Sequence, residues 1–173
     1  LFNKAMKYET GVFTSPEATK AFEAMGTLLS NVEPSTVANA NKQSFTKNQQ
    51  LILDNKALFM PNGTWVVGEM AKAPRADGFK WAMTAAPAIE KGGKRYVYSF
   101  FEHIWVPKES KNQAAAKEFL SFLYSDKAAE IFAKYNAAQP IQGVTAKLPE
   151  ELKALYKVVD EVDGVINGNF VAT

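Results

Sequence analysis

The sequence contains no cysteine and one histidine, His103, among its 173 residues. The absence of cysteine excludes a disulfide framework, a thiolate metal site and a cysteine nucleophile. With a single histidine, a zinc site built by this chain would depend mostly on carboxylate ligands, so we predict no metal site. His103 itself is interpreted as a structural residue rather than a ligand or a base.

Long apolar runs and an excess of charge of one sign are also missing. No run approaches the roughly 20 apolar residues that cross a bilayer, so we predict no transmembrane segment in the chain. The 20 basic and 18 acidic residues leave a net charge of +2. Because this balance gives no long-range attraction for nucleic acid, we expect no nucleic-acid partner. The chain begins at Leu1 rather than methionine, which favours a fragment or a processed form.

Motifs of several common catalytic and cofactor sites are absent as well. The sequence has no G-x-S-x-G element, no P-loop and no G-x-G-x-x-G fingerprint, so we expect neither an enzyme nor a bound cofactor. The alternative is a glycosidase that uses Glu69 and Glu102 as its carboxylate pair. Nothing in the sequence fixes their separation, and Glu69, one helical turn after Trp65, is better interpreted as a surface or hydrogen-bonding residue of a helix.

The residues that are present indicate one folded domain. Hydrophobic residues make up 47% of the chain and charged residues 22%, a composition typical of soluble folded proteins. Capping residues and the spacing of apolar side chains predict several helices and two loops at 35–43 and 136–143. The helices are expected from Ser15 to Pro34, Phe45 to Asp54, about Thr64 to Lys72, around Ala116 to Leu123, Ser125 to Tyr135, and Pro149 to Asp163.

Short apolar runs between these helices predict strands at 57–60, 80–87, 96–98 and 104–106. The pair Gly92-Gly93 favours a hairpin between the second and third of them. Trp81 and Trp105 fall inside strand patterns and are predicted to be core residues. Helices mixed with strands predict an α/β fold with helices packed on a mixed sheet.

Trp65 is the first candidate for ligand contact, because it follows a predicted strand and the turn 61–63 at the start of a helix. Open α/β sheets bind ligands beyond the carboxyl ends of their strands, where the first N–H groups of a helix can donate hydrogen bonds. An indole face can also pack on the apolar face of a sugar ring. The residues alone leave a core position for Trp65 as an equal alternative.

Phe100, Phe101 and Glu102 form a second candidate cluster between two predicted strands. Side chains alternate along a strand, so two adjacent phenylalanines cannot both face a core. Glu102 could accept charge-assisted hydrogen bonds from sugar hydroxyls. A sheet edge covered by other sequence is the alternative interpretation.

Three segments resemble the family 1 extracellular solute-binding proteins, the group that includes the maltodextrin-binding proteins. Residues 59–65, Phe-Met-Pro-Asn-Gly-Thr-Trp, are similar to the family's F-x-x-x-G-x-W segment. Residues 106–123 resemble its block of Pro, Ser-Lys-Asn and a Phe-Leu-rich helix, and residues 138–141 resemble the short proline loop that follows. The order and spacing agree from about Ser15 to Ile141.

The resemblance implies the type II periplasmic-binding-protein fold, in which two α/β lobes are joined by hinge strands. The chain 1–173 would be mostly the C-terminal lobe, with the N-terminal lobe absent and the tail 165–173 belonging with the missing sequence. Trp65 would stack on the ligand, and Asn62, Gly63 and Thr64 would line the same turn. Phe100 to Glu102 occupy the loop where many relatives carry glycines, which is a departure from the family.

The implied function is the non-catalytic, extracellular component of a bacterial ABC importer, as a surface lipoprotein or in the periplasm. It would capture a sugar or oligosaccharide by closure of the two lobes and deliver it to a membrane permease. A peptide or polyamine is the alternative ligand. The uncharged turn from Asn62 to Trp65 disfavours a strongly charged one.

Overall fold

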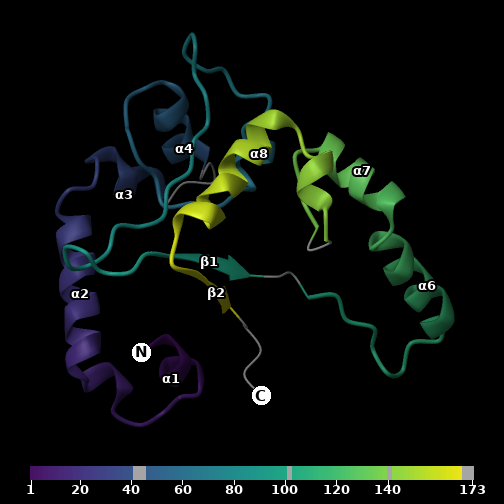
Figure 1. Cartoon of the computed structure of the whole chain (residues 1–173), viewed down its shortest axis with the longest axis horizontal. Coiled ribbons are helices and arrows are strands. Elements are labelled where there is room, and N and C mark those ends of the chain that lie inside the picture. Colours follow the sequence, from purple (N-terminus) through teal and green to yellow (C-terminus); the bar gives the residue numbers. More distant parts are fainter. Residues whose placement is uncertain (41–45, 101–102, 140–141, 169–173) are drawn as a thin grey trace.

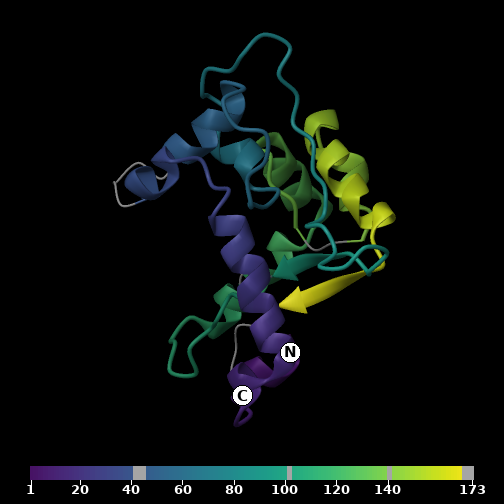
Figure 2. The ribbon, with the colours of Figure 1, turned by 90° about the vertical axis from the view of Figure 1, so that its left-hand side faces the viewer.

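The computed structural model describes residues 1–40, 46–100, 103–139 and 142–168 (Figures 1 and 2). Helices dominate, and a small sheet pairs β1 with β2 in parallel, Tyr96 opposite Gly164. The arrangement is compatible with part of an α/β lobe. In chain order the elements are α1 (Phe2–Met6), η1 (Val12–Thr14), α2 (Pro16–Leu29), α3 (Ser35–Ala40), α4 (Thr46–Leu53), α5 (Val66–Glu69), β1 (Tyr96–Phe100), α6 (Gln113–Leu123), α7 (Asp126–Lys134), η2 (Val144–Lys147), α8 (Glu150–Tyr156), η3 (Lys157–Glu161) and β2 (Gly164–Gly168).

One hydrophobic core joins α4, α5, α7 and α8 with the extended segment that contains Trp81. Phe79 packs edge-on against the Trp81 ring, with the ring centres 5.0 Å apart. Figure 1 shows α8 at the middle of this region, with α4 on one side and α7 on the other. The buried members are Leu53, Val66, Val67, Met70, Trp81, Ala133, Leu148, Leu152 and Leu155.

The predicted starts of two helices are confirmed. The backbone N–H of Ala18 donates to Ser15 Oγ at 3.3 Å at the start of α2, and that of Ala128 donates to Ser125 Oγ at 3.2 Å at the start of α7. Each bond satisfies a donor that the first turn of a helix leaves unpaired. Local sequence therefore fixes where both helices begin.

Two predicted strands do not form. Residues 57–60 have no ladder partner, and their Leu58 and Phe59 side chains are exposed. Residues 104–106 also have no ladder partner, and Trp105 is 71% exposed rather than buried in a core. An apolar run becomes a strand only where a neighbour satisfies its backbone groups, and within the described ranges neither segment has one.

For residues 80–87 the predicted buried face is confirmed, but the predicted strand is wrong. Trp81 and Ala85 are buried and Met83 is half-buried, so the predicted face of this segment lies inward. No ladder is assigned to it, however, and the Gly92-Gly93 turn does not join it to β1 as a hairpin. Trp81 and Met83 pack in the core formed mainly by helices rather than against a sheet.

The strand β1 pairs instead with β2, which includes the start of the tail 165–173 that was expected to belong with the missing sequence. Arg95 and Asp163 align the two strands, because the Arg95 N–H donates to Asp163 Oδ2 at 2.8 Å and the Asp163 N–H donates to the Arg95 carbonyl oxygen at 2.9 Å. The parallel pairing brings residues nearly seventy positions apart side by side, as Figure 2 also shows. Such a long-range pairing leaves no local signal in the sequence.

Two further corrections concern helices. Residues 35–40, predicted as a loop, form α3, whose first backbone N–H donates to Glu33 Oε2 at 2.9 Å. The helix predicted from about Thr64 to Lys72 is shorter and spans only α5. Within the described ranges, no helix combines the length and apolar character needed to cross a bilayer.

Candidate functional site

The site begins at the turn 61–64, which leads into α5. Asn62 Oδ1 accepts the Gly63 N–H at 2.8 Å, and Gly63 O accepts the Val66 N–H at 3.2 Å. Val66 and Val67 then anchor α5 in the core, while Trp65 at its N-cap remains 45% exposed. The turn thus presents an indole at the surface on a firmly packed support.

Gly63 permits the position of the Trp65 ring. A Cβ atom built on Gly63 would lie 2.0 Å from Trp65 Cζ3, well inside van der Waals contact. The ring therefore lies directly over the Gly63 backbone, and any larger residue at position 63 would displace it. The motif G-x-W is explained here by contact between its two named residues.

Trp65 and its turn line a broad concavity of about 3080 Å³. This volume exceeds the roughly 300–1,000 Å³ of an ordinary small-ligand pocket, so the hollow is an open face rather than a closed site. Segments from across the chain form its walls: the end of α4, residues 77–88, β1, the loop after α7, and α8.

The loop after α7 lies beside α5, because Gly68 lets the two backbones approach closely. A Cβ atom at Gly68 would lie 3.2 Å from the carbonyl oxygen of Tyr135 and 3.5 Å from that of Asn136. Trp65 sits one helical turn before Gly68, so the indole and this loop belong to the same part of the concavity. From the sequence, Tyr135 was predicted only as the end of a helix and was not proposed for the site.

Three buried polar atoms in the lining of the concavity lack a hydrogen-bond partner among the described residues. They are Oδ1 of Asn48, Nε1 of Trp81 and Oε1 of Gln139. The Nε2 group of the same Gln139 side chain donates to the carbonyl oxygen of Leu123. A buried polar atom left unpaired costs about 1–3 kcal/mol, so each of the three is a candidate for contact with a ligand or with water.

Glu69 is held by the fold. Its Oε2 accepts a 2.7 Å hydrogen bond from Nε2 of the buried Gln49, which ties α5 to α4. This contact agrees with the interpretation of Glu69 as a hydrogen-bonding residue. Its proposed catalytic partner Glu102, together with Phe101, lies outside the described residues, and Phe100 is the last residue of β1.

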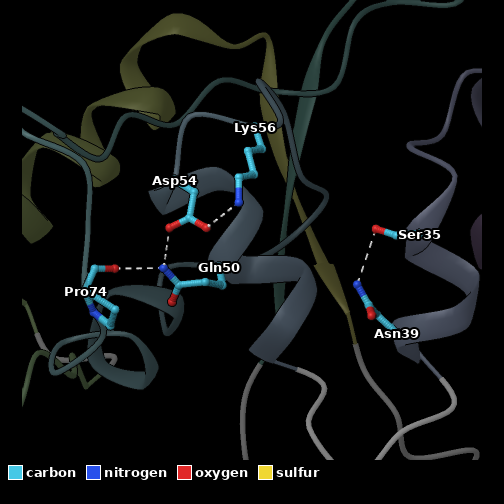
Figure 3. A network of polar contacts seen from close by, with 6 residues as sticks. All are labelled: Ser35, Asn39, Gln50, Asp54, Lys56 and Pro74. Atoms are coloured by element: carbon cyan, nitrogen blue, oxygen red, sulfur yellow. Dashed lines mark hydrogen bonds and ion pairs between the residues drawn. The ribbon is translucent and has the colours of Figure 1, made fainter.

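A polar network secures the end of α4 (Figure 3). The residues that follow this helix, Asn55 and Lys56, line the concavity. Gln50 Nε2 donates to Asp54 Oδ1 and to the carbonyl oxygen of Pro74, both at 2.8 Å. The amide of Gln50, and after it the ammonium of Lys56, lower the pKa of the Asp54 carboxyl. These hydrogen bonds stabilise the wall of the concavity, and we assign no chemical reactivity to them.

His103 and Trp105 stack with their ring centres 5.9 Å apart, and both are exposed. His103 lines the concavity and Trp105 does not. In the part of the chain that the structure describes, no group of three or more histidine or acidic side chains is placed to hold a metal ion.

The sequence pattern of the family described as "Bacterial extracellular solute-binding protein" matches residues 2–155. The chain belongs to this family. The Diacetylchitobiose binding protein NgcE of Streptomyces coelicolor is 32% identical over 140 residues, which are 77% of this chain and 29% of that relative. The chain therefore spans less than a third of the length of NgcE. No solved structure matches the chain.

Membership of the solute-binding family confirms the resemblance drawn from the three sequence segments. The matched range includes the turn 61–64, Trp65, Gly68 and the loop after α7. It ends at the core residue Leu155, before β2.

Proposed function

We propose that this chain forms mostly the C-terminal lobe of the substrate-binding component of an ABC importer, with the type II periplasmic-binding-protein fold. The Trp65 ring, held over Gly63 on the wall of a concavity, carries the proposal. A partly exposed indole on a rigid support offers a flat apolar face, and the C–H face of a pyranose is its complement. Because the ring is already positioned, little freedom is lost when a sugar binds.

The proposed ligand is a neutral sugar or oligosaccharide. The turn beside Trp65 consists of Asn62, Gly63 and Thr64, which carry no charge and offer amide, hydroxyl and backbone groups to hydroxyls. The relative NgcE is named for binding diacetylchitobiose, a disaccharide of N-acetylglucosamine. That sugar is therefore the first ligand to test. Phe100, Phe101 and Glu102 stay in the proposal as further contacts.

The protein is proposed to capture its ligand without chemical change. Glu69, which the glycosidase alternative requires, is engaged by Gln49 in a contact between two helices. The chain's family is one of solute-binding proteins. Diacetylchitobiose recovered intact after prolonged incubation with the protein is the expected result, and release of N-acetylglucosamine would restore the enzymatic alternative.

Transport follows from closure of two lobes on the sugar. A ligand that contacts both lobes binds the closed state more tightly and shifts the equilibrium toward it. The closed protein, outside the cytoplasmic membrane as a lipoprotein or in a periplasm, then delivers the sugar to the permease. A smaller radius of gyration with ligand, measured by X-ray scattering on the intact protein, is the expected sign of closure.

Calorimetry of the intact protein with diacetylchitobiose tests the role of Trp65. Trp65→Ala should lose roughly 1–3 kcal/mol of binding free energy, the scale of a buried aromatic contact. Trp105→Ala is the matched control, because Trp105 is more exposed but does not line the concavity, and its affinity should stay that of the wild type. Equal affinity of both variants and the wild type would remove Trp65 from the site.

A further inference from the structure

Tyr135 is an exposed aromatic residue on a fixed backbone. It caps the C-terminal end of α7, and its side chain is 70% exposed although Ala128, Ala129 and Ala133 of the same helix are buried. A large aromatic side chain that is this exposed beside a core either has no binding role or belongs to a contact surface. Its surroundings distinguish the two.

The backbone around Tyr135 is held from two sides. Asn136 adopts the left-handed conformation, φ 56°, and the next N–H, of Ala137, donates at 3.0 Å to the carbonyl oxygen of Phe132. This is the Schellman ending of a helix. From the other side, α5 approaches the carbonyl oxygen of Tyr135 at Gly68. The ring is therefore carried on a backbone that needs no reordering when a ligand arrives.

Tyr135 and Trp65 line the same concavity from two different elements, α7 and α5. The Gly68 contact fixes one element against the other. Beyond Tyr135 in the same loop lies Gln139, whose buried Oε1 has no partner in the described part of the chain. Aromatic faces together with an unused acceptor are what an amphipathic, hydroxyl- and amide-bearing ligand requires.

We propose that Tyr135 is a second sugar-stacking residue, which makes the site prefer a disaccharide over a monosaccharide. This inference rests on the proposed sugar-binding function and adds to it a determinant of ligand length. Trp65 packs on one ring of the ligand, and Tyr135 packs on the neighbouring ring. A monosaccharide reaches only one of the two aromatic faces.

Calorimetry with diacetylchitobiose and with N-acetylglucosamine, on the intact protein, tests this division of roles. Tyr135→Ala should weaken diacetylchitobiose binding roughly three- to tenfold, the fold-change that corresponds to one aromatic stacking contact. Binding of N-acetylglucosamine should stay within about twofold of the wild type. Tyr135→Phe, which keeps the ring and removes the hydroxyl, should bind both sugars like the wild type.

Two control variants test whether the loss of binding is specific to Tyr135. Tyr8→Asn removes an exposed tyrosine that does not line the concavity, and asparagine suits the left-handed conformation at this position. It should leave both affinities unchanged. Trp65→Ala should weaken binding of both sugars. Because Tyr135 is exposed, its variants should melt at the wild-type temperature, which excludes unfolding as the cause of weaker binding.

Four results would overturn the proposal for Tyr135 in whole or in part. Wild-type affinity in Tyr135→Ala, with Trp65→Ala weakened, would reject Tyr135 and leave the proposed function in place. Equal losses for both sugars would reject its role in ligand length. A loss in Tyr135→Phe as large as in Tyr135→Ala would replace stacking with a hydroxyl contact. If the wild type binds neither sugar, both the proposed function for this ligand class and the role of Tyr135 fail.

Discussion

The helices α8 and α6 have similar sequence patterns and opposite environments. Leu152 of α8 is 1% exposed at the centre of the core, whereas Phe119 of α6, on a comparable apolar stripe, is 59% exposed. The helix α2 resembles α6, because its Phe22 is also exposed. Figure 1 shows α2 and α6 at opposite sides of the molecule, with the packed region between them.

The difference in exposure between α8 and the pair α2 and α6 shows that forming a helix and burying its apolar face have separate causes. The apolar spacing and the cap make α2 a helix, but only a neighbouring element can bury its stripe. Exposed apolar side chains gathered on one face mark surfaces that contact other protein. In the two-lobed protein proposed above, the outer faces of α2 and α6 are available for such contacts, while the packed region carries the candidate site.

The largest effect should come from opening the packed region. Leu152→Ala removes a fully buried side chain and should lower the free energy of unfolding by about 2–5 kcal/mol. Leu29→Ala, on the exposed stripe of α2, should change it by less than about 0.5 kcal/mol. Urea unfolding of both variants measures the contrast. A comparable loss at Leu29 would mean that α2 is buried in the protein measured, and the comparison of the two regions would fail.

Substitution of one glycine in each region should change the free energy of unfolding in opposite directions. At Gly68 in α5 an added Cβ meets the carbonyl oxygen of Tyr135 at 3.2 Å, but at Gly26 in α2 it meets nothing within 4 Å. Gly68→Ala should therefore destabilise by about 1–2 kcal/mol through overpacking. Gly26→Ala should stabilise by roughly 0.5–1 kcal/mol, because alanine favours the helix. Thermal or urea unfolding measures the stability of both variants. Stabilisation by Gly68→Ala would show that the contact between α5 and α7 is loosely packed.

These contrasts explain which parts of the fold sequence analysis could predict. The starts of α2 and α7 depend on Ser15 and Ser125, whose hydrogen bonds are local, and both were predicted correctly. The inward face of residues 80–87 was also correct. The predicted strand at 57–60 was wrong, because strand formation requires a neighbour that the local pattern does not specify. The pairing of β1 with β2 was missed for the same reason.

In the candidate site, too, features that depend on local sequence were predicted and features that depend on remote contacts were missed. Trp65 was identified from the turn before it and from the family resemblance, and the contact of its ring with Gly63 supplies the physical reason for the motif. Trp105 was predicted to be a core residue because its run is apolar, yet it is exposed. Tyr135 was missed because its position depends on Gly68, which is remote in sequence. An apolar residue just before an Asn-Ala-Ala-Gln-Pro loop was the available signal.

The smallest effect concerns two ion pairs, one in each region. Lys147 Nζ lies 2.7 Å from Asp126 Oδ1 at the start of α7, and Lys20 Nζ lies 3.0 Å from Glu90 Oε1 beside α2. In each pair the hydrogen bond from the lysine lowers the pKa of the carboxyl. A carboxyl whose pKa is lower in the folded state stabilises the fold above its unfolded pKa and loses that contribution as pH falls through the lowered value.

Carboxyl NMR titration of Asp126 and Glu90 tests whether both regions hold their ion pairs in solution. Lys147→Met should raise the pKa of Asp126 to its ordinary value, and Lys20→Met should do the same for Glu90. Both pairs are exposed, so stability at neutral pH should hardly change. A lowered pKa at Asp126 together with an ordinary one at Glu90 in the wild type would show that the ion pair beside α2 is not held in solution. That result would extend the contrast between the packed region and α2 from burial to electrostatics.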